Sequence, residues 1–208
     1  RGEYFSMILF SLLGVLLTAS ANDWVVLFFA VELVSIPTYV LVALSRDDMR
    51  SSEAAIKYFF LGALSAALLV LGLVYLYGAT GTTAIHKIVD GSGVPIIQGG
   101  AAMTTLSTVG LLLVFAGLAF KTAAVPFHSY VADVYEGAAS PVAGLLGFVP
   151  KFAGFIAFIK VLAAIGWNLP GDLAWLLWVM AAATMTVGNV LALLQRNVKR
   201  MLAYSSVA

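Results

Sequence analysis

The sequence predicts an all-helical protein that crosses a lipid bilayer several times. Hydrophobic residues make up 62% of its 208 positions and charged residues only 10%, whereas soluble domains average roughly 45–50% and about 25%. Uncharged runs at 58–85, 91–120 and 173–195 each exceed the ~20 apolar residues that a membrane helix needs. The period-two alternation of a membrane β-barrel is absent, so the spans are predicted to be helices.

Hydropathy divides the chain into seven segments, which must be helical because backbone groups in lipid have to be hydrogen-bonded within the protein. We expect about six complete spans and a truncated seventh. Since the chain opens at Arg1 rather than at a methionine, we also expect it to be part of a longer protein. The segments cover 4–21, 24–44, 54–77, 100–136 with a break, 141–165, 173–195 and a stretch that begins near 198.

Capping residues support three of these helix starts. Asp23 precedes the second segment, and its carboxylate can accept hydrogen bonds from the first turn. Ser51 or Ser52 is predicted to cap the third segment. Ser140 is predicted to cap the fifth, with Pro141 in its first turn, where a proline is well tolerated.

The fourth segment is too long for one straight helix. A helix over 100–136 would measure ~55 Å against a hydrocarbon core of ~30 Å. Pro126 lies inside it and leaves the carbonyl of Thr122 without its usual donor. The pattern favours a discontinuous helix that breaks around 122–127, and the alternative is a loop at 122–128 followed by a surface helix.

Basic residues in the short loops predict the orientation. By parity, the loop after the second segment and the loop before the seventh lie on one side of the membrane, which should be the cytoplasmic or matrix side. The opposite loop, at 78–100, is rich in glycine and carries only His86, Lys87 and Asp90. The basic residues of the first two loops are Arg46, Arg50, Arg196, Lys199 and Arg200.

Charge and cysteine content exclude several functions. A formal net charge of +1 argues against nucleic acid as a partner. The chain has no cysteine, so it can hold neither a thiolate iron–sulfur cluster nor a thiolate zinc site. Two histidines provide few possible axial ligands for haem iron. We therefore expect no cofactor in this chain, and any electron transfer must take place elsewhere.

Three ionisable residues fall deep inside predicted spans. Glu32 lies ~13.5 Å along its helix from Asp23, and Lys151 lies ~15 Å from Pro141, both near the bilayer midplane. Lys121 lies on the broken helix just before its proline. A charge at the bilayer centre costs ~2.5–3.5 kcal/mol on insertion scales, so these groups need partners, water or neutralisation.

Two interpretations of these groups remain open. Glu32 and one lysine can form a fixed ion pair that locks helices together, but the second lysine is then left over. Alternatively, the groups form a proton relay, because burial favours the neutral forms of lysine and glutamate and so allows proton exchange near neutral pH. The sequence does not decide which lysine pairs with Glu32.

Other ionisable residues have less specific interpretations. Lys57 lies near the start of its helix, where reaching the aqueous interface is as good an explanation as a functional role. His128 suits a relay because imidazole titrates near neutral pH. An equally good alternative is that His128 only contributes to packing. We expect Asp133 and Glu136 to be solvated at the cytoplasmic end, and Lys160 to reach the opposite interface.

Four stretches that include most of these residues carry a resemblance to a known family, the antiporter-like proton-pumping subunits of respiratory complex I. In the third, the run from Asp133 to Gly137 looks like subunit N (mitochondrial subunit 2) more than its paralogues L and M. The stretches are Ala30–Pro37, Glu53–Phe59, Phe120–Ala138 and Val198–Ser206.

The resemblance implies a bundle of inverted five-helix repeats, each with a discontinuous helix. On this basis, residues 1–23 form a span from the preceding region. Residues 24–165 form most of the first repeat, and 166–208 form the start of the second.

The resemblance also implies the site residues. Glu32 corresponds to the membrane glutamate, Lys121 to the lysine of the broken helix and Lys151 to the lysine of the next helix. Lys57 and His128 match accessory positions of the proton path. In one state Lys121 would pair with Glu32, and when that pair is perturbed it would pass a proton toward Lys151, with His128 and bound water bridging longer gaps.

This sequence departs from the family pattern near the proposed path. Tyr130 and Ala132 stand where the family usually has tryptophan and proline, and Val149-Pro150 replaces the valine-serine that is common before the lysine. These changes affect packing but keep the ionisable groups.

The function that we expect is that of a proton-translocating membrane-arm subunit of NADH:quinone oxidoreductase, a translocase subunit without a redox centre of its own. Its partners would be the other membrane-arm subunits, the flavin and iron–sulfur subunits of the same complex, and the lipid bilayer. The location would be the bacterial plasma (inner) membrane or the mitochondrial inner membrane. The alternatives are a subunit of a multi-subunit Na⁺/H⁺ antiporter, and a scaffold subunit whose buried charges only fix helix packing.

Overall fold

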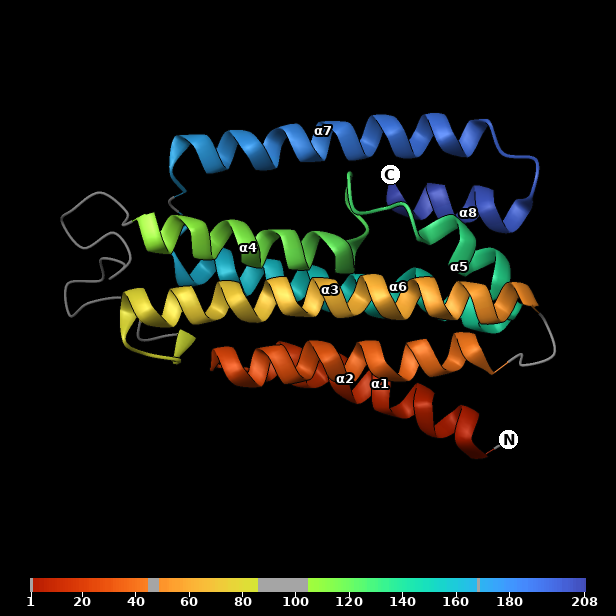
Figure 1. Cartoon of the computed structure of the whole chain (residues 1–208), viewed down its shortest axis with the longest axis horizontal. Helices are drawn as coiled ribbons and strands as arrows, with labels where there is room; N and C mark the ends of the chain where they lie inside the picture. Colours follow the sequence, from red (N-terminus) through yellow and green to blue (C-terminus); the bar gives the residue numbers. More distant parts are fainter. Residues whose placement is uncertain (1, 45–48, 86–104, 168) are drawn as a thin grey trace.

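A computed structural model describes residues 2–44, 49–85, 105–167 and 169–208. The chain forms a bundle whose long helices run side by side along one axis (Figure 1). The helices described are α1 (Gly2–Ser20), α2 (Trp24–Ala43), α3 (Met49–Thr80), α4 (Thr105–Thr122), α5 (Val131–Gly137), α6 (Ser140–Ala164), α7 (Gly171–Leu193) and α8 (Val198–Val207).

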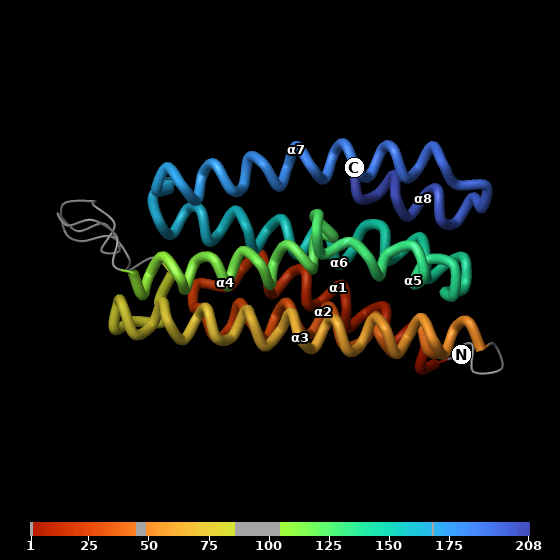
Figure 2. The backbone as a smooth tube through the Cα atoms, turned by 45° about the horizontal axis from the view of Figure 1, so that its top comes forward, coloured from red at the N-terminus to blue at the C-terminus, as the bar shows by residue number. Residues whose placement is uncertain are grey.

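The predicted fold class is confirmed. Among the described residues, six helices are long and apolar enough to cross a membrane, namely α1, α2, α3, α4, α6 and α7. Helices α2, α3, α4 and α6 form the core, which is built around side chains such as Trp24, Leu76, Phe115 and Ile165. Helix α7 lies along the outside with α8 running back beside it (Figure 2), and only Leu173 and Gly188 of α7 are buried.

Of the three predicted caps, only that of Asp23 is confirmed. Its carboxylate accepts hydrogen bonds from the backbone of Val25 at 2.8 Å and Val26 at 3.4 Å. The prediction for the fifth segment is wrong, because Ala139 occupies the N-cap position of α6 without a side-chain hydrogen bond, and Ser140 is already helical.

The predicted cap of the third segment is also wrong. Helix α3 begins at Met49, so neither Ser51 nor Ser52 precedes it. Ser51 is instead buried and donates a hydrogen bond to the carbonyl of Val42 in α2 at 2.7 Å. This bond between two helices satisfies the hydroxyl inside the helix, which hydropathy alone does not reveal.

Small residues bring α3 and α4 into backbone contact. A Cβ atom added at Gly72 would lie 2.7 Å from the carbonyl oxygen of Gly110, and one added at Gly117 would lie 2.9 Å from the Leu69 side chain. The hydroxyl of Ser65 donates to the carbonyl of Gly117 at 2.9 Å. Close packing of small residues with an interhelical hydrogen bond is the usual way in which membrane helices associate, and both features join α3 to α4 here.

The predicted break is present, and it extends over 123–130. Helix α4 ends after Thr122 in a Schellman motif, in which the backbone N–H groups of Ala123 and Ala124 donate to the carbonyls of Phe120 and Ala119 at 3.0 and 2.8 Å. Ala123 has a φ of 62°, the left-handed conformation that this motif requires and that glycine usually supplies.

The chain resumes its helical course in α5, which is not a surface helix. Five of its residues are buried, including Val131, Val134 and Tyr135, and the helix packs against α3, α6 and α8. The discontinuous helix is therefore a better description than a loop followed by a helix at the surface.

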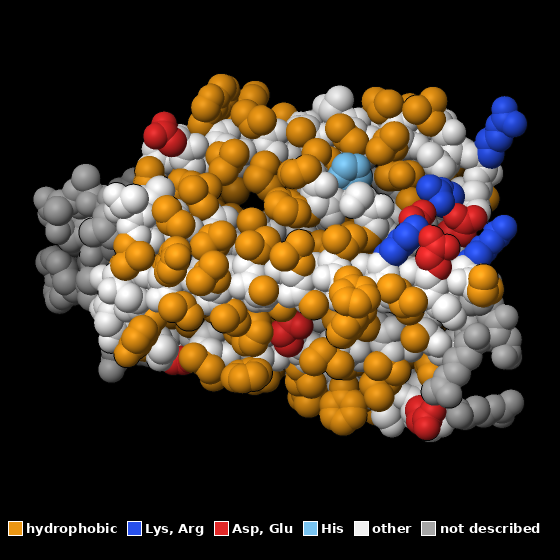
Figure 3. Space-filling view, viewed as in Figure 1, with side chains coloured by type: hydrophobic (Ala, Val, Ile, Leu, Met, Phe, Trp, Pro, Cys, Tyr) orange, Lys and Arg blue, Asp and Glu red, His pale blue; other side chains and the backbone are white. Residues whose placement is uncertain are grey.

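Basic and acidic side chains gather at the end of the bundle where α5 and α8 lie, while hydrophobic side chains cover most of the remaining face (Figure 3). Arg50 and Arg200 both contact Glu136 there, so these two basic residues lie at the same end, as predicted. Lys160 donates to the carbonyl of Ala21 at 2.6 Å, in the α1–α2 connection. Four further residues were used to predict the orientation but lie outside the described ranges: Arg46, His86, Lys87 and Asp90.

Candidate functional site

A buried ion pair joins α4 to α2. The Nζ atom of Lys121 lies 2.9 Å from Oε1 of Glu32, with side-chain exposures of 4% and 15%. The same ammonium donates to the hydroxyl of Ser35 at 2.6 Å. Of the two lysines predicted to lie deep in the spans, the structure therefore assigns Lys121 to the glutamate.

Local structure explains why these groups meet. Glu32 and Ser35 are three residues apart in a helix, so they share one face of α2. The Ser35 hydroxyl donates its hydrogen to the carbonyl of Val31 at 2.9 Å, which leaves its oxygen free to accept from the ammonium of Lys121. Lys121 lies in the last turn of α4, where the partial negative charge of a helix C-terminus favours a cation.

Lys151 on α6 has a different environment. Its ammonium donates to the carbonyl and to the hydroxyl of Ser206 in α8, the latter at 2.8 Å. Within the described ranges, no carboxylate forms an ion pair with it. The hydroxyl of Ser206 also lies 3.3 Å from that of Tyr135. The second lysine is therefore held by neutral oxygen atoms.

One small cavity lies between the two lysines. Its volume is ≈ 10 Å³, which is about the space that one water molecule requires. The lining is mostly apolar and aromatic, with both ammonium-bearing side chains on its wall. The lining residues are Tyr58, Lys121, Tyr130, Val131, Val134, Tyr135, Leu146, Pro150 and Lys151.

Two tyrosines of this lining stack on each other. The rings of Tyr58 and Tyr130 stack with centroids 5.3 Å apart, and Tyr130 stacks on Phe120 at 4.3 Å. The Tyr130 hydroxyl donates to the carbonyl of Phe120 at 2.9 Å. Tyr130, where the family usually has tryptophan, thus ties the end of α4 to the start of α5 and keeps the turn that carries Lys121 in place.

The other two predicted site residues lie apart from this cavity. His128 belongs to the break, and it is not part of the lining. Its Nδ1 atom is buried without a hydrogen-bond partner among the described residues. Lys57 lies at the charged end of the bundle, where it pairs with Glu53 at 2.7 Å and Asp133 at 2.8 Å. The structure thus brings together Glu32, Lys121 and Lys151, but not His128 or Lys57.

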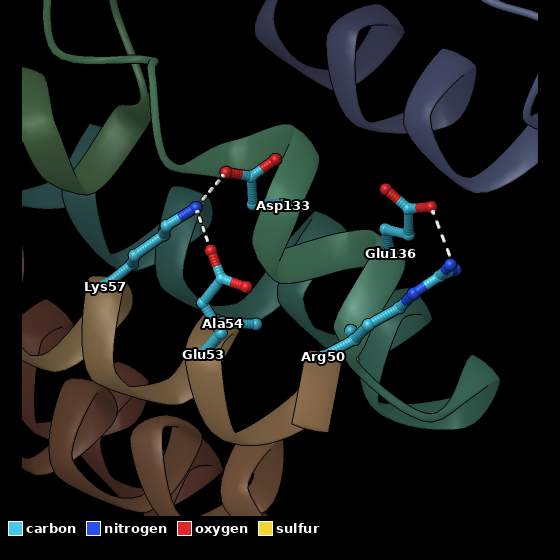
Figure 4. Close-up of a pocket in the computed structure, with 7 residues that line it drawn as sticks. Arg50, Glu53, Ala54, Lys57, Asp133 and Glu136 are labelled. Carbon is cyan, nitrogen blue, oxygen red and sulfur yellow. Dashed lines mark hydrogen bonds and ion pairs between the residues drawn. The ribbon is translucent and has the colours of Figure 1, made fainter. Parts of the chain in front are cut away.

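The charged end contains a pocket of ≈ 300 Å³, whose lining includes Lys57 and its two acidic partners (Figure 4). The sequence suggested that Asp133 and Glu136 are simply solvated there, but both also form ion pairs. Arg200 of α8 pairs with them at 3.1 and 2.8 Å. These ion pairs connect α3, α5 and α8, which are distant in sequence, so no local pattern could predict them.

The ion pairs of Asp133 predict how the bundle responds to acid. The hydrogen bond from Lys57, with the nearby charges of Lys57 and Arg200, holds the pKa of Asp133 below its usual range, although partial burial acts in the opposite direction. A carboxylate with a lowered pKa stabilises the fold above its unfolded-state pKa of about 3.9, and this stabilisation is lost as the pH falls through the folded-state value. We therefore expect the contribution of Asp133 to the thermal unfolding midpoint to be constant from about pH 7 to 5, to decline below about pH 4, and to disappear once the pH falls below the folded-state pKa.

The variant Asp133→Asn should unfold at a lower temperature at neutral pH and should lack this acid-dependent component. Glu53→Gln is the matched control, because it removes the more exposed partner of Lys57 and leaves Asp133 in place. Thermal unfolding measured across this pH range checks the prediction. An unchanged acid response in Asp133→Asn would contradict it.

Several of the contact residues could not be identified from the sequence. The sequence gives only a weak indication that Ser35 belongs to the site, namely its position one helical turn from Glu32. Tyr135 and Ser206 both lie in motifs that carry the family resemblance, but nothing in their spacing places them beside Lys151. Their role depends on the way α5 and α8 pack against α6.

Comparison with known proteins gives a consistent result. Residues 21–208 match the family model described as NADH:quinone oxidoreductase/Mrp antiporter, TM. The chain is 44% identical over 208 residues to NADH-quinone oxidoreductase subunit N of Trichlorobacter lovleyi, and it covers 42% of that protein. The chain thus spans about two fifths of the length of this curated relative.

Two solved structures show the same fold. A chain of respiratory complex I from Thermus thermophilus with bound aureothin superposes with a TM-score of 0.82 at 35% identity, over 100% of this chain and 43% of that one. A chain of the Mrp complex from Dietzia sp. superposes with a TM-score of 0.84 at 26% identity, over 97% of this chain and 36% of that one.

Proposed function

The chain belongs to the NADH:quinone oxidoreductase/Mrp antiporter family of membrane proteins, and from this we propose that it translocates protons as part of subunit N in the membrane arm of an NADH:quinone oxidoreductase. The observation that carries the proposal is the buried Lys121–Glu32 pair, with Lys151 on the wall of the same small cavity. The similarity to subunit N of bacteria supports the choice of complex.

The proposed mechanism is electrostatic. While Glu32 lies beside it, Lys121 is stabilised as an ammonium ion. When a change in a neighbouring subunit draws Glu32 away, the ammonium loses its counter-charge in a poorly solvated site and releases its proton. Lys151, which only neutral oxygen atoms hold, first releases its own proton onward along the path. A single water in the cavity can then carry the proton of Lys121 to the neutral Lys151 amine.

The remaining parts of the complex supply the driving reaction. Quinone reduction takes place in subunits with flavin and iron–sulfur centres, and this chain contributes only the ion path. Lys57 serves in proton uptake from the pocket at the charged end, and His128 acts from the break in the helix. The bilayer is the bacterial plasma membrane or the mitochondrial inner membrane, with the charged end in the cytoplasm or matrix.

Replacement of Lys151 by methionine in the full-length subunit tests this function. We expect proton pumping per NADH oxidised, measured in vesicles that contain the assembled complex, to fall several-fold. Lys160→Met is the matched control, because it makes the same change on the same helix but at a lysine that bonds to the α1–α2 connection. Equal pumping by the two variants and the wild type would refute the function.

A second candidate function is cation–proton antiport without redox coupling. The close superposition on a chain of the Mrp complex favours it. Purification of the protein with its native partners distinguishes the two functions, because an oxidoreductase contains subunits with bound flavin and iron–sulfur clusters and an antiporter does not.

A further inference from the structure

A chain of hydrogen bonds connects α5, α8 and α6 through Tyr135, Ser206 and Lys151. The hydroxyl oxygen of Ser206 lies 2.8 Å from the Lys151 ammonium and 3.3 Å from the Tyr135 hydroxyl. We propose that Tyr135 and Ser206 are positioning residues that hold the Lys151 ammonium at the edge of the cavity shared with Lys121. This inference rests on the proposed function.

The bonding capacity of Ser206 explains why Tyr135 is needed. A hydroxyl donates one hydrogen bond and accepts two. The hydrogen of Ser206 is shared between two acceptors, the carbonyl of Ala203 at 2.7 Å and the hydroxyl of Tyr135 at 3.3 Å. With its hydrogen directed at these two oxygen atoms, Ser206 turns an acceptor position toward the ammonium of Lys151 at 2.8 Å. Rotation of the Ser206 hydroxyl away from this arrangement would break the bonds to Ala203 and Tyr135.

Tyr135 is itself firmly held. Its residue exposure is 6%, and it projects from α5, which ion pairs of Asp133 and Glu136 attach to α8. Across the interface, α6 carries Gly147, where an added Cβ atom would lie 3.4 Å from the Tyr135 hydroxyl. The tyrosine hydroxyl therefore has a fixed position against which Ser206 can be oriented.

The absence of an ion pair makes Lys151 sensitive to these two residues. Within the described ranges, its ammonium bonds only to the oxygen atoms of Ser206, and hydrogen bonds to a charged group are stronger than those between neutral groups. Loss of one acceptor therefore makes its protonated state less favourable. The titratable groups that face it across the cavity are Lys121 of α4, Tyr58 of α3, Tyr130 of the break and Tyr135 of α5.

A double-mutant cycle in the full-length subunit within the assembled complex tests the proposal. We expect Ser206→Ala to lower pumping per NADH by about tenfold and Tyr135→Phe by about threefold, as for loss of a charged and a neutral hydrogen bond. The double variant should be no worse than Ser206→Ala alone, because Tyr135 acts through Ser206. The alkaline limb of the pH profile of NADH-driven pumping should move to lower pH in each variant, by about one unit in Ser206→Ala.

Tyr77→Phe is the matched control, since this tyrosine of α3 is 51% exposed and lies on another face, and its pumping and pH profile should equal those of the wild type. The inference would be overturned if Tyr135→Phe kept the wild-type pumping per NADH and the wild-type pH profile. It would also be overturned if the losses of pumping in the two single variants added in the double variant. If Ser206→Ala fails to assemble, the pH profile of Tyr135→Phe decides, because a purely structural role would not move it.

The outcomes also separate this inference from the function on which it rests. Normal pumping by Lys151→Met would refute the proton path through Lys151 altogether. Loss of pumping by Lys151→Met, with wild-type behaviour of Tyr135→Phe, would leave the path intact and remove only the positioning role.

Discussion

Replacement of Lys121 by alanine is expected to abolish most proton pumping by the assembled complex. Lys121 both pairs with Glu32 and lines the cavity toward Lys151, so its loss would interrupt the proposed path at its centre. A positioned acid–base group contributes about 10²–10⁴-fold to proton transfer, and we expect pumping to fall by at least about tenfold. The measurement is proton uptake by vesicles, normalised to the rate of NADH oxidation.

Two further variants distinguish the loss of the titratable group from structural damage. Lys121→Met keeps most of the side-chain volume and should lose pumping to the same extent, whereas a cavity effect would appear only in Lys121→Ala. Lys160→Met again serves as the matched control on another helix. If Lys121→Ala pumps normally at normal NADH turnover, the buried charges are structural, and the scaffold interpretation replaces the proton path.

The combination of Glu32→Gln with Lys121→Met is expected to separate stability from transport. Each single change leaves one buried charge without its partner, which costs about 3–5 kcal/mol or forces that group to become neutral. Removal of both partners is often nearly neutral for stability. The double variant should therefore unfold close to the wild-type temperature, while each single variant unfolds at a lower temperature.

Transport should not recover with stability. A proton path needs the titratable group itself, so the double variant is expected to assemble and to pump no better than Lys121→Met. Thermal unfolding of the purified complex and pumping in vesicles are measured on the same preparations. Full pumping by a stable double variant would mean that the pair only fixes the packing of α2 against α4.

The sequence predicted the fold well because membrane spans follow from hydropathy alone. All six spans were expected, and the break before Pro126 followed from the length of the fourth segment. The start of α3 was missed because its polar first turn is stabilised by Ser51, which bonds to a carbonyl of α2. A contact between two helices leaves no signal in the local pattern.

The sequence identified the ionisable residues of the candidate site but left their pairing open. The helical rise predicts deep positions for Glu32 and Lys151, whereas the choice of Lys121 as the partner depends on how α4 packs against α2. The same holds for Asp133, whose ionic partners come from α3 and α8. The family motif supplied His128 as a candidate, but it did not show that the cavity between the lysines is lined by tyrosines instead.

The backbone contact between α3 and α4 has a consequence for the speed of the transfer step. Because α3 and α4 pack closely at Gly72 and Gly117, we expect Lys121 to move by changes of its side-chain rotamer rather than by displacement of α4. Side-chain rotamers change in picoseconds to nanoseconds, whereas helix displacements take roughly microseconds to milliseconds. On the proposed mechanism, Lys121 therefore reorients many times within one turnover, and we expect the frequency of proton transfer to be limited by how often Glu32 leaves it.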